Sequence, residues 1–391
     1  MMVACDIPLF KANHTEFKSF MAKYAQKKVP DQSTMRKHYL KEVYENVLEE
    51  IRSNIGDSSI FVSIDESTDK AGRYVCNVVV GPLRQGGRGY LLTSEVIPKV
   101  NASEIAKLFD NSLKLLWPEE VQRDKVLIFV TDAAPYMKKS VVGIQLFYPR
   151  IIHITCIAHG VHRICEKLRS QYANVDSLIA NIKKAFSKSP SRIRFFKEKQ
   201  PDLPLPPQPV LTRWGTWLEA ASYFAKNFNE IKEIVEGLDD DAACVIFAKK
   251  LFANKGIREE LAYIQANFGF LLSEGNAFKM LQKRGEPISN PLAILNSIEN
   301  NLKQAKGPVA KIILDKFYKV FQSNQGLQVI KKVAAIVNGE KFVELPENIA
   351  INEVEFLNWA PLVSVDVERT FSSFKATARK FQNAFSSIVL L

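Results

Sequence analysis

The stretch Phe61-Val-Ser-Ile-Asp65-Glu-Ser-Thr68 is an apolar run that ends in a carboxylate and a group of hydroxyls. Ile60, Val62 and Ile64 alternate with other residues, which predicts a largely buried β-strand. Asp65 is then expected where the chain leaves the sheet, and the ligands of open α/β sheets bind at strand ends. An Asx turn or a helix cap is the plainer interpretation of this aspartate.

A second strand also ends in an acid. Lys125-Val-Leu-Ile-Phe-Val-Thr131-Asp132 is again a buried type of strand, and turn residues follow it at Ala133-Ala-Pro135. If the two strands are parallel neighbours, Asp65 and Asp132 face one another across a gap of the size of a metal ion. Two acidic strand ends favour a site over two unrelated turns.

Composition narrows the class of protein. The 391 residues are enough for two or three domains, and an apolar fraction of 47% is ordinary for a folded, soluble protein. Asp6 precedes any hydrophobic region, so no signal peptide is expected, and no apolar run has the length of a membrane span. Five cysteines without Cys-x-x-Cys spacing predict free thiols inside the cell. The net charge of +11 favours a polyanionic partner such as nucleic acid.

Cations are concentrated between Lys183 and Lys199, with phenylalanines interleaved among them. The candidates for DNA contacts here are Lys183, Lys184, Arg192 and Arg194. Such cations neutralise phosphates while aromatic rings stack on exposed bases. The alternative is a solvated helix face whose phenylalanines point into the core.

The order of the expected elements predicts the fold class. Strands are expected at 59–67, 74–81, 89–98, 125–132 and 151–157, with helices at 103–117 and 136–147. Three meandering strands followed by alternating helices and strands predict an α/β protein with a mixed sheet and helices on its faces. This order is that of the ribonuclease-H-like fold.

The chain is expected to divide into five segments. They are an N-terminal helical collar (1–58), the first part of the ribonuclease-H-like core (59–199), a proline-rich linker (200–210), a large all-α insertion (211–345) and a C-terminal helix of the core (346–391). Five prolines predict an extended polyproline conformation for the linker. Helical periodicity without a fixed repeat predicts an irregular helical domain in the insertion.

Two helices carry apolar stripes. In residues 33–55, Tyr39, Val43, Val47 and Ile51 recur every four residues, so this face is expected to pack on the core that begins near residue 59.

The C-terminal helix has a stripe formed by Val363, Val367, Phe371, Phe374, Ala378 and Phe381. Glu368 lies about 100° round the helix from Val367. A helix packed on a sheet can lean such an acid toward the strand ends, so a third carboxylate is available.

Five short stretches together carry a resemblance to a known family. They are Ser63-Ile-Asp-Glu-Ser-Thr-Asp69, Phe129-Val-Thr-Asp-Ala-Ala-Pro-Tyr-Met137, His153-Ile-Thr-Cys-Ile-Ala-His159, Leu211-Thr-Arg-Trp-Gly-Thr-Trp217 and Ser364-Val-Asp-Val-Glu-Arg-Thr-Phe-Ser372. The chain resembles the hAT superfamily of DNA transposases, in the branch of CGG-triplet-repeat-binding-like proteins. In that family a large helical insertion separates the second and third acids of a ribonuclease-H-like domain.

The resemblance implies that Asp65, Asp132 and Glu368 are the metal-binding acids of a DDE site. Two Mg²⁺ or Mn²⁺ ions roughly 4 Å apart would support in-line attack on a phosphodiester. The implied activity is cleavage of DNA at element ends and joining of the freed 3′ ends to a target.

The resemblance also implies DNA contacts outside the acids. Arg213 and Trp214 match an Arg-Trp motif whose Trp stacks on an extruded base. Cys156 and His159 match a Cys-x-x-His motif near the active site. Core packing is the alternative for Trp214 and Trp217, and a buried cysteine with a satisfied histidine is the alternative for the second motif.

The remaining expectations come from the same family. They are a nuclear location, DNA as partner, and self-association through the C-terminal region, weakened because this region is short here. No membrane and no small-molecule cofactor are expected, and the BED zinc finger usual in the family is not seen.

Two other functions stay open. One is a domesticated, catalytically inactive DNA-binding or dimerising protein of chromatin or transcription. The other is a ribonuclease-H-like hydrolase that acts on RNA.

Overall fold

The computed structural model describes residues 2, 5, 7–187, 189–210, 215–239, 242–273, 280–281, 283–340, 343–347 and 349–371. The chain forms two compact units. The first contains Met1–Cys156, Arg284–Ile288 and Val329–Leu391, and the second contains Ile157–Lys283 and Ser289–Gln328. The helical unit therefore begins at Ile157, whereas the sequence pattern predicted an insertion from 211.

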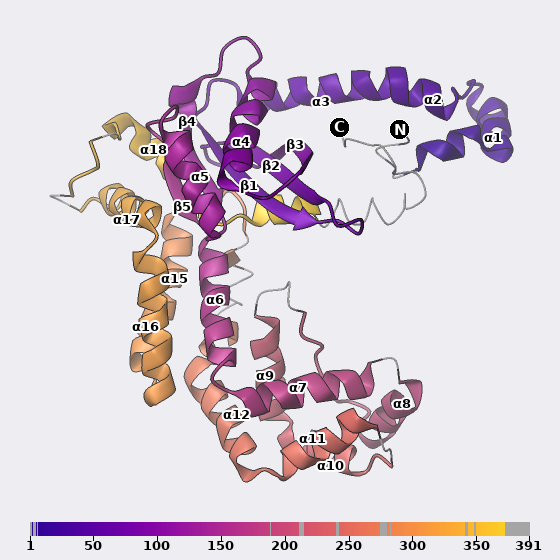
Figure 1. Ribbon diagram of the computed structural model, residues 1–391, viewed down its shortest axis with the longest axis vertical. Helices are drawn as coiled ribbons and strands as arrows, with labels where there is room; N and C mark the ends of the chain where they lie inside the picture. The colour runs from indigo at the N-terminus through magenta and orange to yellow at the C-terminus, as the bar shows by residue number, and fades with distance from the viewer. Residues whose placement is uncertain are drawn as a thin grey trace. The chain divides into compact units, whose positions relative to one another are not determined.

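The described part of the first unit is built on one mixed sheet of five strands (Figure 1). The strands are β1 (Ile60–Thr68), β2 (Tyr74–Pro82), β3 (Tyr90–Ile97), β4 (Val126–Thr131) and β5 (Ile152–Thr155). Their order is β3-β2-β1-β4-β5; β2 is antiparallel to both β1 and β3, and β4 and β5 run parallel to β1. Each strand lies within two residues of its predicted range, so the mixed α/β sheet is confirmed.

One face of the sheet forms the main hydrophobic core of this unit. Ile60, Val62 and Ile64 of β1 project to this face. They pack with α3 (Leu40–Ile55), α4 (Ala102–Leu116) and α5 (Pro135–Gln145). Asn101 caps α4 by accepting a hydrogen bond from the backbone N–H of Glu104 at 3.0 Å.

The other face carries the alternate residues of β1, which include Ser63 and Asp65. Helical residues 365–371 pack on this face. Asn77 of β2, which is paired with Asp65, donates a hydrogen bond to Thr370 of this helix at 2.6 Å. Val367 of this helix is fully buried. Residues 372–391, with the expected stripe positions Phe374, Ala378 and Phe381 and the expected self-association region, lie outside the described residues.

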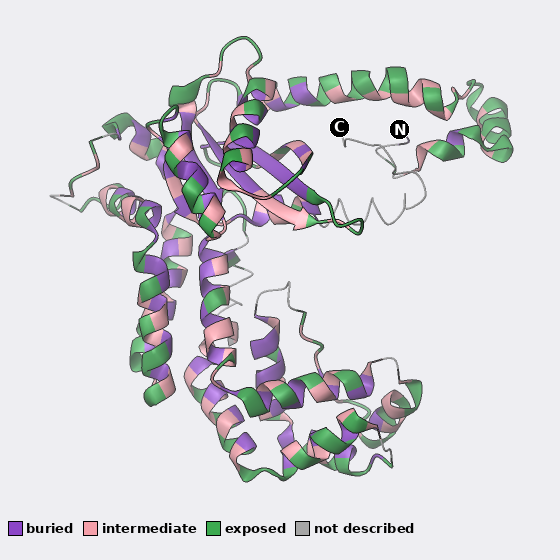
Figure 2. Cartoon of the chain, viewed as in Figure 1, coloured by how far each residue is buried: buried purple, intermediate pink, exposed green. Residues whose placement is uncertain are grey.

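The N-terminal helices correct one prediction. They are α1 (Thr15–Ala25), α2 (Gln32–Thr34), a π-helical turn η2 (Met35–Tyr39) and α3. Tyr39, Val43 and Val47 are 52%, 44% and 45% exposed, so the predicted packing stripe is wrong for all but Ile51. Leu48 and Ile55 are buried together with Ile51, so the buried face of the helix is rotated by about 100° from the predicted one. Figure 2 shows α3 exposed along most of its length.

All the regular secondary structure in the described residues of the second unit is helical. Its helices are α6 (Ile157–Arg169), α7 (Ala173–Phe186), α8 (Pro190–Lys199), α9 (Thr216–Lys226), α10 (Phe228–Glu236), α11 (Ala243–Ala253), α12 (Lys255–Phe268), α13 (Phe270–Ser273), α15 (Ser289–Gln304) and α16 (Pro308–Gln322). α9 ends before Asn227, and α10 begins directly after it at Phe228. The Asn227 side chain donates to the Tyr223 carbonyl at 2.9 Å, and such local bonds compete with a continuing helix.

Four short elements and one longer helix, α17, complete the described part of the chain. They are η1 (Leu9–Asn13), η3 (Arg123–Lys125), α17 (Gln325–Val337), η4 (Ile351–Glu353) and α18 (Val354–Leu357). None of the described helices combines the length and apolarity of a membrane span.

Candidate active site

The two aspartates end neighbouring parallel strands. β1 and β4 are in register up to the pair Ser63 and Val130, and the Ser63 hydroxyl donates to the Val130 carbonyl at 3.1 Å. Continuing this register by two residues on each strand brings Asp65 beside Asp132, and neighbouring strands lie about 4.8 Å apart. Both aspartates are half-buried. The tertiary structure therefore brings together the two acidic strand ends that are far apart in the sequence.

Local hydrogen bonds orient both carboxylates. Asp65 Oδ1 accepts from the backbone N–H of Glu66 at 3.0 Å, and Asp132 Oδ1 accepts from that of Ala134 at 2.9 Å. The second contact is an Asx turn that leads into α5 at Pro135. Asp132 therefore forms an Asx turn and also lies at the edge of the sheet.

Glu368 is carried across the same sheet edge by a helix anchored at both ends. At one end the backbone N–H of Ser364 donates to Cys156 Sγ at 3.3 Å, and the Cys156 N–H donates to the Thr131 carbonyl at 2.8 Å. At the other end Thr370 bonds to Asn77, the residue paired with Asp65 on β2. Glu368 lies between these anchors, so the backbone of its helix crosses the ends of β4 and β1.

The donor set suits a hard divalent cation, because carboxylate oxygens are the ligands that Mg²⁺ prefers. Within the described ranges, no group of three or more His, Cys, Asp or Glu side chains is close enough to hold a metal ion. Glu368 Oε1 accepts from the Ser364 hydroxyl at 3.2 Å, and Asp132 accepts from Ala134. A metal bound by all three acids therefore requires their side chains to turn from these partners toward one another.

Two further polar residues lie beside the acids. The Tyr136 hydroxyl, on the first turn of α5, donates to Glu66 Oε1. Burial raises the pKa of Glu66, and the negative charge of Asp132 raises it further. Burial and the neighbouring acids Glu66, Asp132 and Asp65 likewise raise the pKa of Tyr136. This edge is therefore a concentrated negative region, which favours cations.

Sequence reasoning missed Glu66 and Tyr136. Both come directly after the acidic strand ends, in Asp65-Glu66 and in Asp132-Ala-Ala-Pro-Tyr136. The sequence shows that both residues follow an acidic strand end. Only the packing of α5 on β1 shows that their side chains meet.

The expected Cys-x-x-His motif divides between the two units. Cys156 is 2% exposed and belongs to the first unit, where it holds Ser364. His159 is a half-buried residue of α6 in the second unit. Arg213 and Trp214 lie outside the described residues.

The basic stretch of the second unit has two kinds of cation. Lys183 donates to the Pro209 carbonyl at 2.5 Å, and Arg192 donates to the Ala185 carbonyl at 2.9 Å. Lys184 and Arg194 are exposed. The rings of Phe186 and Phe196 pack edge to face with their centroids 5.4 Å apart, and both are buried. These two phenylalanines belong to the core, as the alternative interpretation expected, so they are not free to stack on bases.

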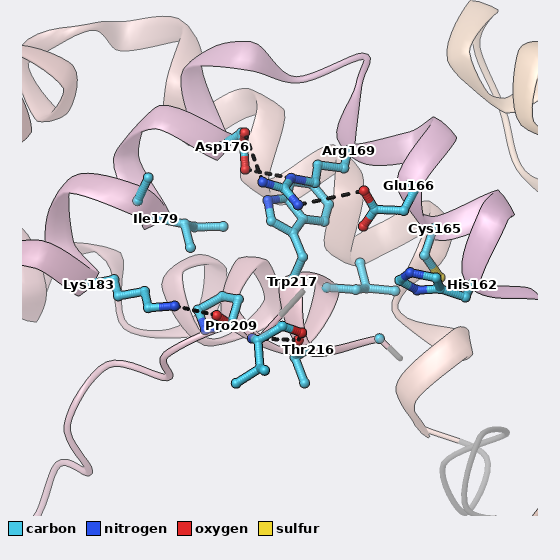
Figure 3. A pocket seen from close by; sticks show the side chains of 14 residues that line it. His162, Cys165, Glu166, Arg169, Asp176, Ile179, Lys183, Pro209, Thr216 and Trp217 are labelled. Atoms are coloured by element: carbon cyan, nitrogen blue, oxygen red, sulfur yellow. Dashed lines mark hydrogen bonds and ion pairs between the residues drawn. The ribbon is translucent and has the colours of Figure 1, made fainter. Parts of the chain in front are cut away.

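A cavity of about 190 Å³ lies between α6, α7 and α9 of the second unit (Figure 3). Trp217 lines it and is only 5% exposed, which agrees with core packing for this residue. Arg169 also lines the cavity and is held by Asp176, its Nε 2.8 Å from Asp176 Oδ1 (Figure 3). Among the described residues, Trp217 Nε1 and His162 Nδ1 are buried without a hydrogen-bond partner, and both line this cavity.

Comparison with known proteins bears on the N-terminal half of the chain. Residues 30–185 match the family described as Domain of unknown function (DUF659). That domain is found in hAT-type transposase-like proteins, so the match supports a broad relationship to the hAT family. It covers Asp65 and Asp132 and ends before the stretch that carries Glu368. No curated protein matches the chain.

Proposed function

We propose that this chain is a hAT-type transposase or a transposase-derived protein, with a metal-dependent site for DNA phosphodiesters at Asp65, Asp132 and Glu368. The observation that carries the proposal is the sheet edge itself. Two acids end adjacent parallel strands, and a helix anchored on both sides of them carries the third. The DUF659 match supports the same family.

A ribonuclease-H-like fold interrupted by a helical insertion is part of this proposal. Three antiparallel strands followed by two parallel ones, in the order β3-β2-β1-β4-β5, support it. The helical unit lies between β5 and the helix of Glu368 in the sequence, which is the place of such an insertion.

Mg²⁺ or Mn²⁺ held by the three acids would activate a water or a 3′-hydroxyl and stabilise the leaving oxygen. The protein's own contribution is to hold the acids at one edge. Ser364 and Thr370 fix the helix, and the turn at Ala134 fixes Asp132. DNA as partner, the nuclear location and self-association through the C-terminal region are proposed with it, and the basic charge supports the first of these.

The test is cleavage of end-labelled hairpin and duplex DNA in Mg²⁺ or Mn²⁺. The parent should nick DNA, and Asp65→Asn and Glu368→Gln should each abolish nicking while still binding DNA. Cleavage that survives both substitutions contradicts the site. An RNA duplex in parallel separates a DNA enzyme from a ribonuclease.

A second candidate keeps the fold for DNA binding or dimerisation in chromatin or transcription, without the reaction. The observation that favours it is that Asp132 and Glu368 already accept hydrogen bonds from protein groups. DNA binding without cleavage under either metal would support this candidate against the first.

A further inference from the structure

Helices α6 and α16 of the second unit pack along one another and bring four cations together (Figure 1). The four, called the α6–α16 cationic ridge below, are Arg163 and Lys167 of α6 and Lys316 and Lys319 of α16. None of them belongs to the basic stretch between Lys183 and Lys199.

The packing of the two helices explains why the four side chains meet. Gly160 of α6 lies so close to α16 that an added Cβ would be 2.8 Å from the ring of Phe321. From this contact α6 continues to Arg163 and Lys167. The positive charges of both residues lower the pKa of Lys316, so Lys316 lies close to them. Since Phe321 contacts Gly160 and Lys316 lies near Arg163 and Lys167, α16 runs antiparallel to α6. Each helix thus contributes two cations to one seam.

The charges in the ridge are not neutralised by the protein. None of the four side chains forms an ion pair within the described ranges. The nearby acid of α6, Glu166, pairs with Arg169 at 3.6 Å instead. Arg163 and Lys319 are exposed, and Lys167 and Lys316 are half-buried.

The electrostatic consequence is visible at Lys316. Burial lowers its pKa, and the positive charges of Arg163, Lys319 and Lys167 lower it further. Gathering like charges destabilises the folded chain unless an anion binds there. A surface that keeps four unpaired cations together is typical of a site for a polyanion.

We propose that the α6–α16 cationic ridge binds the phosphodiester backbone of duplex DNA, as a docking surface additional to the acidic site. The inference rests on the proposed function, because DNA is the proposed substrate. Fixed cations on packed helices contact phosphates without reading sequence, so the ridge contributes affinity and orientation. Binding at the ridge requires no metal ion.

The experiment measures duplex binding by fluorescence anisotropy, with EDTA present, across a series of NaCl concentrations. The test protein is the full chain with Arg163→Gln, Lys167→Gln, Lys316→Gln and Lys319→Gln combined. The control removes the same number of charges from the same unit at Lys226, Lys232, Lys250 and Lys255, each changed to Gln. Thermal melting checks that both variants fold.

Each phosphate contact contributes about 0.9 to the slope of log affinity against log salt. We expect the ridge variant to lose about three units of slope and at least about tenfold in affinity at moderate salt. The control variant should lose clearly less of both. An unchanged slope in the ridge variant, or an equal loss in the control, overturns the proposal.

Two further arms identify the partner and separate this inference from the catalytic proposal. If the ridge variant loses binding to phosphatidylserine vesicles but not to duplex DNA, the nucleic-acid assignment is wrong. Because binding is read in EDTA, it does not depend on cleavage. If the parent protein does not cleave DNA but the ridge variant loses binding, the catalytic proposal is refuted and the ridge proposal is supported. If the ridge variant cleaves DNA and binds it as the parent does, the ridge proposal is refuted and the catalytic proposal is supported.

Discussion

Asn77 is expected to hold the helix of Glu368 against the sheet. Its side chain is fully buried, and both ends of its amide are used. Nδ2 donates to Thr370 Oγ1 at 2.6 Å, and Oδ1 accepts from the Ser94 hydroxyl at 2.6 Å. Asn77→Ala removes both bonds and leaves the Ser94 hydroxyl buried without its acceptor. The loss of one buried and one partly buried hydrogen bond, with one donor left unpaired, costs about 2–4 kcal/mol of folding free energy.

The assay is a double-mutant cycle with Thr370→Val, which keeps the shape of the side chain and removes its hydroxyl. Urea unfolding followed by circular dichroism gives the free energy of each variant. We expect a coupling energy of about 1–2 kcal/mol between the two positions, as for residues in one hydrogen-bond network. Thr370→Ser, which keeps the hydroxyl, should behave nearly as the parent. Additive losses at Asn77 and Thr370 would refute the reasoning, because they would show that the helix is held by other contacts.

Three further outcomes are expected. Burial lowers the pKa of His153 from 6.5 to about 4, so its protonation favours the unfolded chain. Stability should fall by about 3 kcal/mol between pH 6.5 and 4. His153→Gln, which can still bond the Thr131 hydroxyl, should flatten melting temperature against pH over this range; an equally steep curve would count against it. Glu353 is 6% exposed and pairs with Arg150, so Glu353→Ala should cost about 3 kcal/mol in urea unfolding, and a loss below about 1 kcal/mol would show the pair to be dispensable. Lys316→Gln should raise the melting temperature, since it relieves repulsion of a few tenths of a kcal/mol or more, and a lower melting temperature would contradict the unpaired ridge.

The strands were predictable because β-strand patterns are local. Val62 and Ile64 alternate with polar or outward residues, and this alternation is visible in any short window of sequence. The face that α3 buries was not predictable in the same way. Two apolar stripes about 100° apart run along that helix, and local periodicity does not say which one meets the sheet.

In the candidate site, too, some residues were predictable from local sequence and others were not. Asp65 and Asp132 could be singled out because each ends an apolar run, and Glu368 because it flanks a stripe and matches a family motif. Asn77 carried no comparable pattern, and the motif stretches that contain Cys156 and Ser364 gave no sign that these residues anchor the helix. Their roles depend on contacts between residues that are far apart in the chain, such as the bond between Ser364 and Cys156.

The sequence by itself determined the α/β class, the positions of the strands, the excess of positive charge and the two acidic strand ends. These features depend on residue type and on spacing within about ten positions. Only the tertiary structure decided that β1 and β4 are parallel neighbours, that the helix of Glu368 crosses their ends, and that four cations of α6 and α16 form one ridge. Each of these depends on which surfaces pack together, and packing is set by the shape and burial of the whole unit, which no short window of sequence contains.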